Sequence, residues 1–126
     1  MALTNTELSE WLQKQIGQTL DIRKGELTDS RNEISDMDQI MLHLDDVLVR
    51  RTNHPDDYVA DEELVLKGHG TIYTEEGNVP LPQDAYEIPL LGDITIQKEQ
   101  DGLKVHTDRA VYTIGTRKEQ QKEKTP

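Results

Sequence analysis

The chain has 126 residues, 33% of them hydrophobic and 31% charged, and its 25 acidic residues against 14 Lys and Arg give a formal net charge of -11. This length suits one domain with its own hydrophobic core, and the acidity argues against nucleic acid and anionic membranes as partners, since both require a basic face. The absence of cysteine excludes disulfides, thiolate metal sites and cysteine nucleophiles.

Charge is spread unevenly along the chain. Residues 117–126 contain four Lys and Arg, two Glu and no apolar residue, so we expect a flexible charged tail after a single compact domain over residues 1–116. Eleven acidic residues and three arginines give residues 29–63 a net charge of -8. The sequence lacks both an apolar run of about 18 residues and a basic, apolar leader, which favours a cytoplasmic location.

The first expected element is an amphipathic helix that ends near Gly17. Thr4 and Glu7 have the spacing of a capping box, in which each side chain bonds the backbone N–H of the other residue. Apolar residues then recur at helical spacing, and glycine commonly ends a helix in the left-handed conformation. The apolar stripe consists of Leu8, Trp11, Leu12 and Ile16.

After Gly17 the apolar residues alternate with a period of two, which indicates strands. A short strand precedes Gly25, and the polar segment 28–38 is expected to be a loop. A strand is predicted over residues 39–51, with a bulge or tight turn at Asp45 and Asp46 where the alternation shifts. A helix is the alternative for this segment, because some of its apolar residues also lie at helical spacing.

Further short strands and turns are expected in the second half. Residues 53–61 are predicted to be a loop, residues 64–73 one strand, and the segment 77–82, which contains two prolines, a long turn. Tyr86 begins another alternating segment. Pro89 restricts that strand to an edge or an end of a sheet, because proline has no N–H to donate to a ladder.

The last strands predict a hairpin and the fold class. Residues 94–96 are expected to pair with 103–105 across Asp101 and Gly102, a good hairpin turn, and residues 110–114 give a final strand. One helix followed by closely spaced short strands indicates an α+β fold. We therefore expect an N-terminal amphipathic helix packed on a curved, mainly antiparallel β-meander sheet or a partly open barrel of about six strands.

The first candidate site is an acidic surface. Converging carboxylates could recognise a basic protein or hold a hard cation, but the spacing is not that of an EF-hand, and most such runs are solvated surface. Arg50 and Arg51 are close enough in sequence to neutralise two of the carboxylates. The members of this surface are Asp45, Asp46, Asp56, Asp57, Asp61, Glu62 and Glu63.

The second candidate is a ligand pocket between the helix and the sheet. Gly68 and Gly70 share one face of the predicted strand, so two side chains are missing from that face. The gap is either a hollow for a small ligand or room for close packing, which is the commoner role of a strand glycine. The residues assigned to the pocket are Trp11, Gly68, Gly70 and Ile72.

Metal and catalytic chemistry find little support. Strand alternation directs His43, His69 and His106 away from the apolar faces, and no two histidines have the short spacing typical of metal ligands. A shared site would require their three strands to be neighbours. No serine lies in a nucleophile elbow. We therefore assign no catalytic residue, no metal and no cofactor.

Three functions follow as hypotheses. The first is a non-catalytic binding domain that recognises a protein partner of basic character through acidic loops or a sheet edge. The alternatives are a small-ligand carrier that uses the pocket under the helix, and a metal-dependent enzyme with histidine and carboxylate ligands. A homodimer that covers the strand with Pro89 is a further option, which like-charged surfaces oppose.

Overall fold

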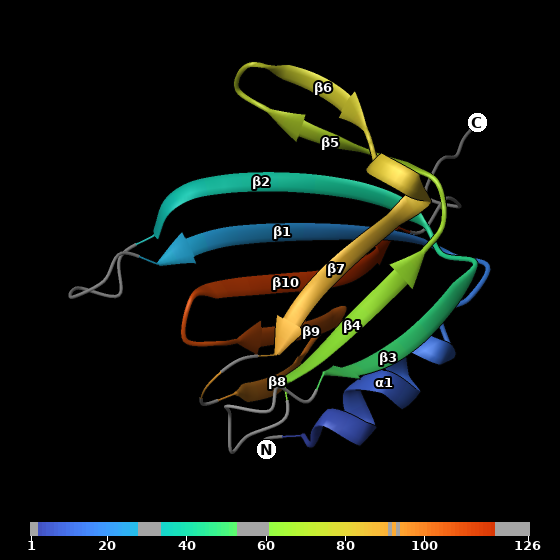
Figure 1. Ribbon diagram of the computed structural model, residues 1–126, viewed down its shortest axis with the longest axis vertical. Coiled ribbons are helices and arrows are strands. Elements are labelled where there is room, and N and C mark those ends of the chain that lie inside the picture. Colours follow the sequence, from blue (N-terminus) through green and yellow to red (C-terminus); the bar gives the residue numbers. More distant parts are fainter. Residues whose placement is uncertain (1–2, 28–33, 53–60, 91, 93, 118–126) are drawn as a thin grey trace.

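The structure, a computed structural model, describes residues 3–27, 34–52, 61–90, 92 and 94–117 (Figure 1). One helix and antiparallel strands make it an α+β fold, as predicted. The expected number of about six strands is too low, because ten strands lie in the described residues. The elements are α1 (Asn5–Gln13), β1 (Thr19–Leu27), β2 (Ile34–His43), β3 (Asp46–Thr52), β4 (Asp61–Lys67), β5 (Gly70–Thr74), β6 (Gly77–Pro80), the 3₁₀ turn η1 (Pro82–Asp84), β7 (Ala85–Leu90), β8 (Thr95–Glu99), β9 (Gly102–His106) and β10 (Ala110–Arg117).

The strands form two sheets. Seven lie in the order β6-β5-β2-β1-β10-β9-β8, and three in the order β3-β4-β7. In Figure 1 the smaller sheet runs obliquely in front of the larger one. The large sheet is not closed into a barrel, since β6 and β8 are its edge strands. Pro89 lies in β7, an edge strand of the small sheet, as its missing N–H predicts.

The two sheets meet at a corner where neighbouring strands bend together. β2 passes into β3 through Leu44 and Asp45, and β4 passes into β5 through Gly68 and His69. The hydrogen-bond ladder continues through the bend: the N–H of His43 donates to the carbonyl of His69 at 2.9 Å, and that of Asp45 to the carbonyl of Lys67 at 2.7 Å. Strands that switch sheets in this way produce strong curvature.

Several predicted boundaries change because of this topology. The expected break near Asp45 is the corner itself, and the single strand expected over residues 64–73 is two strands that bend at Gly68. Residues 34–38, expected to be a loop, belong to β2, and residues 77–80, expected to be a turn, form β6. The β8–β9 hairpin is confirmed, although its pairing of Glu99 with Gly102 places the turn one residue earlier than predicted.

Helix α1 has the predicted start. The N–H of Glu7 donates to Oγ1 of Thr4 at 3.1 Å, and the N–H of Thr4 donates to Oε1 of Glu7 at 2.8 Å, which completes the capping box. Gly17 has a φ of +95°, a conformation that favours glycine. Its N–H donates to the carbonyl of Leu44, so the chain after the helix is attached to the corner.

The N-terminal segment contacts one edge strand of each sheet, β8 of the large sheet and β3 of the small one. Before the helix begins, the N–H of Leu3 donates to the carbonyl of Ile96 in β8, and the helix itself contacts β3 (Figure 1). Leu8 and Leu12 are fully buried. The hydrophobic core lies between the sheets and beneath the helix. It is aliphatic except for one tyrosine, and consists of Leu8, Leu12, Leu20, Ile22, Ile40, Leu42, Leu44, Val47, Leu64, Leu66, Leu81, Ile88, Leu90, Ile96, Leu103, Val105, Ala110, Tyr112 and Ile114. No helix in the described ranges has the length and apolarity needed to cross a membrane.

Removing the cap tests how far α1 depends on its first turn. We expect Thr4→Ala to lower the free energy of unfolding by about 1 kcal/mol, because the N–H of Glu7 loses its side-chain acceptor, Oγ1 of Thr4. Urea denaturation measures this. The matched change Thr6→Ala, at an exposed position inside the same turn, should leave stability unchanged or raise it slightly through better helix propensity. Equal losses in both variants would contradict a capping role.

Candidate functional site

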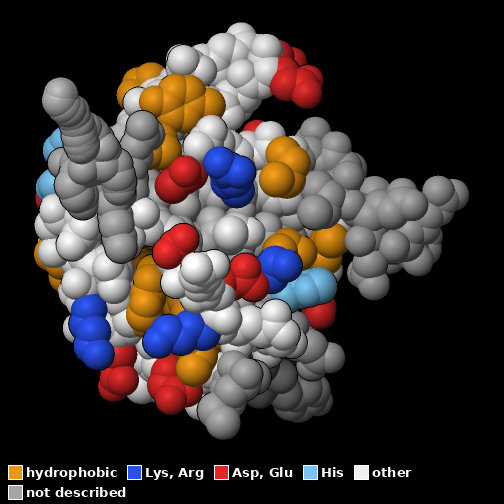
Figure 2. Space-filling view, turned by 180° about the vertical axis from the view of Figure 1, so that it is seen from behind, with side chains coloured by type: hydrophobic (Ala, Val, Ile, Leu, Met, Phe, Trp, Pro, Cys, Tyr) orange, Lys and Arg blue, Asp and Glu red, His pale blue; other side chains and the backbone are white. Residues whose placement is uncertain are grey.

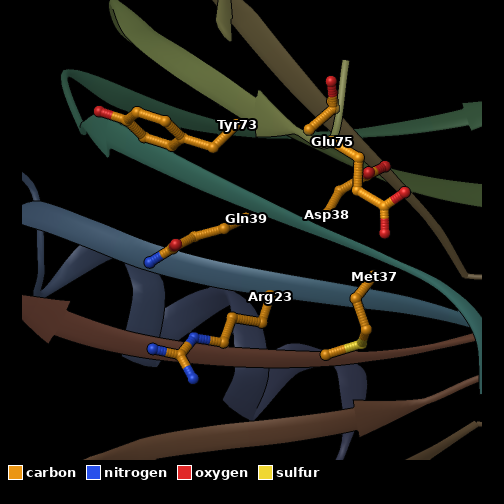
Figure 3. Close-up of a pocket in the computed structure, with 7 residues that line it drawn as sticks. Arg23, Met37, Asp38, Gln39, Tyr73 and Glu75 are labelled. Atoms are coloured by element: carbon orange, nitrogen blue, oxygen red, sulfur yellow. The ribbon is translucent and has the colours of Figure 1, made fainter. Parts of the chain in front are cut away.

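A hollow of about 470 Å³ lies where the β5–β6 hairpin departs from β2 (Figure 3). It exists because β5 pairs with β2 only from Gln39 to Leu42, whereas β2 begins five residues earlier, at Ile34. Beyond Gln39 the two strands separate. The residues that line the hollow are Arg23, Met37, Asp38, Gln39, Tyr73, Thr74 and Glu75.

Three neighbouring strands supply one row of this lining. Gln39 in β2 is directly opposite Arg23 in β1 and directly opposite Tyr73 in β5, so all three side chains share the outer face of the sheet. The amide Nε2 of Gln39 donates to Oδ1 of Asp21 at 3.0 Å, and Nε of Arg23 lies 3.8 Å from the same oxygen. Asp21 therefore holds both polar side chains of the row.

Apolar and acidic groups complete the lining. Met37 is 56% exposed and Tyr73 is 38% exposed, which is high for such large side chains. Figure 2 shows hydrophobic side chains gathered near the β5–β6 hairpin, and acidic and basic ones side by side across the middle of the same face. In Figure 3 Asp38 and Glu75 lie on the same side of the hollow. The lining thus offers apolar contact, one guanidinium and two carboxylates.

The strand edge beside the hollow is unpaired. Within the described residues, β2 pairs with β1 along its whole length, but residues 34–38 have no strand on their other side. In an antiparallel strand alternate residues direct both N–H and C=O to the same side, so part of this backbone faces the free edge. The register shift opposite Glu26 and Leu27 leaves residues 36–38 as the regular part of the edge.

The acidic surface predicted from the sequence is partly neutralised. Nη2 of Arg50 lies 2.7 Å from Glu63 and 3.0 Å from Glu87, and Arg51 pairs with Glu62, as the neighbouring arginines led us to expect. The hydrogen bond from Arg51 lowers the pKa of Glu62, and the hydrogen bond to Glu63 raises the pKa of Arg50. These carboxylates are therefore engaged rather than free.

The other members of that surface are placed as follows. Oδ1 of Asp46 accepts the N–H of Val47 at 2.9 Å, and Oδ1 of Asp45 lies 3.9 Å from Nε2 of His43. Asp61 begins β4. Asp56 and Asp57 lie outside the described residues.

The predicted ligand pocket is not assembled around its two glycines. A Cβ on Gly68 would lie 1.8 Å from the carbonyl oxygen of His43, and one on Gly70 would lie 2.1 Å from that of Met41. The β2 backbone therefore occupies the space, which is the close-packing reading of these glycines. Trp11 packs partly against the core and lines a separate groove of about 320 Å³ beside the β8–β9 turn. Ile72 lies opposite Ile40.

Two of the three histidines meet. The rings of His43 and His69 are stacked with centroids 5.5 Å apart, because both lie at the corner. His106 is in β9, between Thr95 and Val111, three strands away from β2. No group of three or more His, Cys, Asp or Glu in the described ranges could hold a metal ion. The three histidines therefore do not form a common site.

Tyr86 in β7 and Tyr112 in β10 are both largely buried. Burial raises the pKa of Tyr112 to about 12, with a further contribution from Glu26. Burial also raises the pKa of Tyr86, and Tyr112, Asp38 and Glu26 add to it. Nζ of Lys24 lies 5.9 Å from the centroid of the Tyr112 ring. Both phenols are therefore neutral hydrogen-bond donors near neutral pH.

These phenols predict a loss of stability in strong alkali. Unfolded phenols ionise near pH 10, whereas folded Tyr112 holds its proton to about pH 12. The unfolded chain therefore releases this proton first, and the stability that the group contributes below pH 10 falls as pH rises towards 12. Urea denaturation between pH 9 and 12 measures the slope. We expect Tyr112→Phe to make it shallower, and an unchanged slope would contradict the assignment.

The residues of the hollow were missed by sequence reasoning. Alternation places Arg23, Gln39 and Tyr73 on outward faces, which is a usable signal. It does not reveal that β2 and β5 are neighbours, because β3 and β4 intervene in sequence.

Fold and site together define a small α+β protein of two antiparallel sheets, with a groove beside the part of β2 that has a described strand on one side alone. The chain belongs to the YmzB-like protein family, whose model matches residues 1–119. It is 71% identical over 114 residues to the protein YmzB of Bacillus subtilis (strain 168), an alignment that covers 90% of this chain and 96% of the relative. No solved structure matches it significantly.

Proposed function

We propose that this protein is a non-catalytic interaction domain that binds an extended segment of a partner protein along the free edge of β2. The observation that carries the proposal is the unequal pairing of β2: among the described strands, residues 39–42 have neighbours on both sides, whereas residues 34–38 have one on a single side. A hollow of about 470 Å³ lies beside this edge. An added strand would obtain main-chain hydrogen bonds from the edge and side-chain contacts from the hollow.

The lining indicates the chemistry of the partner segment. Met37 and Tyr73 offer exposed apolar surface, and aromatic side chains often anchor interfaces. Glu75 supplies a carboxylate against the guanidinium of Arg23, and Asp38, which lies opposite Lys24 in β1, adds a second negative charge at the margin of the hollow. We therefore expect the segment to carry a Lys or Arg next to a bulky apolar residue, consistent with the basic partner that the overall acidity favours.

A second copy of this chain fits the edge less well. Two copies paired along β2 would bring Asp38 and Glu75 of each close to the same groups of the other, and like charges across a strand pair are destabilising. The edge thus resists self-association while it favours a partner of opposite charge. The acidic surface is the weaker candidate, because Glu62 and Glu63 are already paired with arginines.

The proposal retains three finer expectations from the sequence. These are a cytoplasmic location, one domain over residues 1–116, and a strongly curved sheet that behaves as a partly open barrel. The continuous hydrogen-bond ladder through the corner supports the curvature.

Selection from a library of random short peptides displayed on phage tests the proposal, with the full chain as bait. We expect enriched peptides to combine a basic and a bulky apolar residue. For a synthetic peptide of that sequence, Asp38→Asn and Tyr73→Ser should each weaken binding about tenfold or more, the loss expected at an interface hot spot. Fluorescence anisotropy measures the dissociation constants.

Gln97→Ala provides the matched control, since Gln97 is exposed on β8 at the opposite edge of the same sheet. It should leave the affinity unchanged. The proposal fails if no peptide is enriched, or if both groove variants bind like the unmodified protein. It also fails if size-exclusion chromatography shows a dimer that Asp38→Asn strengthens, because the edge would then be covered by a second copy.

A further inference from the structure

A second hollow, of about 110 Å³, lies at the end of β1 that is remote from the corner. β1 begins at Thr19 opposite His43, near the corner, and the hollow involves Lys24 and Glu26 further along the strand. β10 contributes Tyr112 and Ala110 to it, and β7 contributes Pro89. It is therefore bounded by both sheets and lies apart from the peptide groove on the outer face.

At this hollow the inner face of β1 changes from apolar to charged side chains. Leu20 and Ile22 are fully buried and point into the core. The next residue on that face is Lys24, which lies in register between Tyr112 in β10 and Asp38 in β2. Its Nζ is 3.5 Å from Oε2 of Glu26. A half-buried cation at the end of an aliphatic core requires an anionic or aromatic partner.

Two cations, Lys24 and Arg109, and the carboxylate of Glu26 line this hollow, and Asp38 faces Lys24 from β2. Lys24 shares the carboxylate of Glu26, whereas the guanidinium of Arg109, which also lines the hollow, makes no ion pair within the part of the chain that the structure describes. The guanidinium of Arg109 is therefore the cation at this hollow that remains available to a ligand within the described residues.

Of the two hydroxyl groups at the hollow, that of Thr107 already makes hydrogen bonds within the protein and that of Tyr112 does not among the described residues. Oγ1 of Thr107 is engaged, since it donates to the carbonyl of Ala110 and accepts two backbone N–H groups. The phenol of Tyr112 has no hydrogen-bond partner among the described residues, and it keeps its proton at neutral pH. Among the described residues its hydroxyl is therefore a donor without an acceptor.

We propose that this hollow binds a small organic anion, with the carboxylate between Lys24 and Arg109 and a hydrogen bond from Tyr112. Pro89 and Ala110 provide apolar contact for a short carbon chain. A space of about 110 Å³ corresponds to three or four waters at about 30 Å³ each, which limits the ligand to a short carboxylic acid. The peptide edge on β2 plays no part in this site.

NMR titration of the ¹⁵N-labelled full chain with sodium propionate tests the proposal. We expect saturable shifts of the amides of Lys24, Arg109 and Tyr112, with a dissociation constant in the millimolar range. Inorganic phosphate is the second probe, since it carries charge without a carbon chain. Weaker binding of phosphate supports an organic ligand, and equal or tighter binding overturns that part of the proposal.

Two variants separate binding from folding. Arg109→Gln removes an exposed charge, and Tyr112→Phe keeps the ring and removes the hydroxyl. Each should weaken propionate binding about fivefold or more, while thermal unfolding shows that the variant is folded. The control Lys98→Gln, at an exposed site on β8, should bind as the unmodified protein does. Absence of saturable shifts, or equal affinity in all three variants, overturns the site.

Discussion

Replacing Gly68 by alanine is expected to lower the free energy of unfolding by about 3 kcal/mol. The added Cβ would lie 1.8 Å from the carbonyl oxygen of His43 and 2.9 Å from its carbon, so backbone must move at the corner that joins the sheets. Gly68 also has a φ of +155°, which disfavours an L side chain. Overpacking and backbone strain each cost about 1–3 kcal/mol. Urea denaturation measures the loss.

Gly115→Ala is the matched control for this variant. Gly115 lies in β10, and a Cβ there would meet only the carbonyl oxygen of Asp101, at an ordinary 3.4 Å. We expect a change within about 1 kcal/mol. If Gly68→Ala is as stable as Gly115→Ala, β2 and β4 do not approach as closely at the corner as described.

Truncation of Leu12 to alanine has the other large expected effect. Leu12 is fully buried where α1 covers the core, and removal of such a side chain costs about 2–5 kcal/mol, because transfer energy is lost and a cavity remains. Thermal and urea unfolding measure the change. A loss near the upper end would show that the strands beneath the helix cannot collapse into the cavity.

The neighbouring variant Gln13→Ala isolates the contribution of burial. Gln13 is exposed on the same helix, so its replacement should change stability by no more than about 0.5 kcal/mol. Comparable losses at both positions would mean that α1 is not packed on the core through the predicted stripe.

Local signals predicted the start of the helix and the β8–β9 hairpin. The capping box at Thr4 and Glu7 involves groups only three residues apart, and both of its bonds are present. The β8–β9 hairpin depends on a short turn, and Ile96 and Val105 pair as expected. These features are predictable because the sequence neighbours involved are also neighbours in space.

The corner and the β5–β6 hairpin were not predictable in the same way. Alternation runs through residues 64–73 with no marker of a sheet change except Gly68 and Gly70, and glycines in a strand are also compatible with a hollow for a ligand. The two prolines of segment 77–82 favoured a turn, yet residues 77–80 form β6, an edge strand, where proline is tolerated. Both outcomes depend on which strands become neighbours.

The candidate sites, too, were predictable where they lie within one hairpin and not where they join strands that are distant in sequence. The pairs of Arg50 with Glu63 and Arg51 with Glu62 were anticipated from adjacent arginines, because β3 and β4 form a simple hairpin. The hollow beside β2 depends on the pairing of Gln39 with Tyr73. In the sequence, two strands of the other sheet, β3 and β4, lie between these two residues. Alternation indicated the exposure of these residues but not that they meet.

Amide hydrogen exchange of the full chain, with and without a peptide selected for binding, tests the proposed strand addition most directly. We predict that binding slows exchange at those amides of residues 36–38 that face the free edge, because their N–H groups donate to the added strand. Amides of β8 should exchange at the same rate in both states. Protection confined to Glu62 and Glu63, or to the β6 or β8 edge, with residues 36–38 unaffected, would contradict the β2 edge as the binding site.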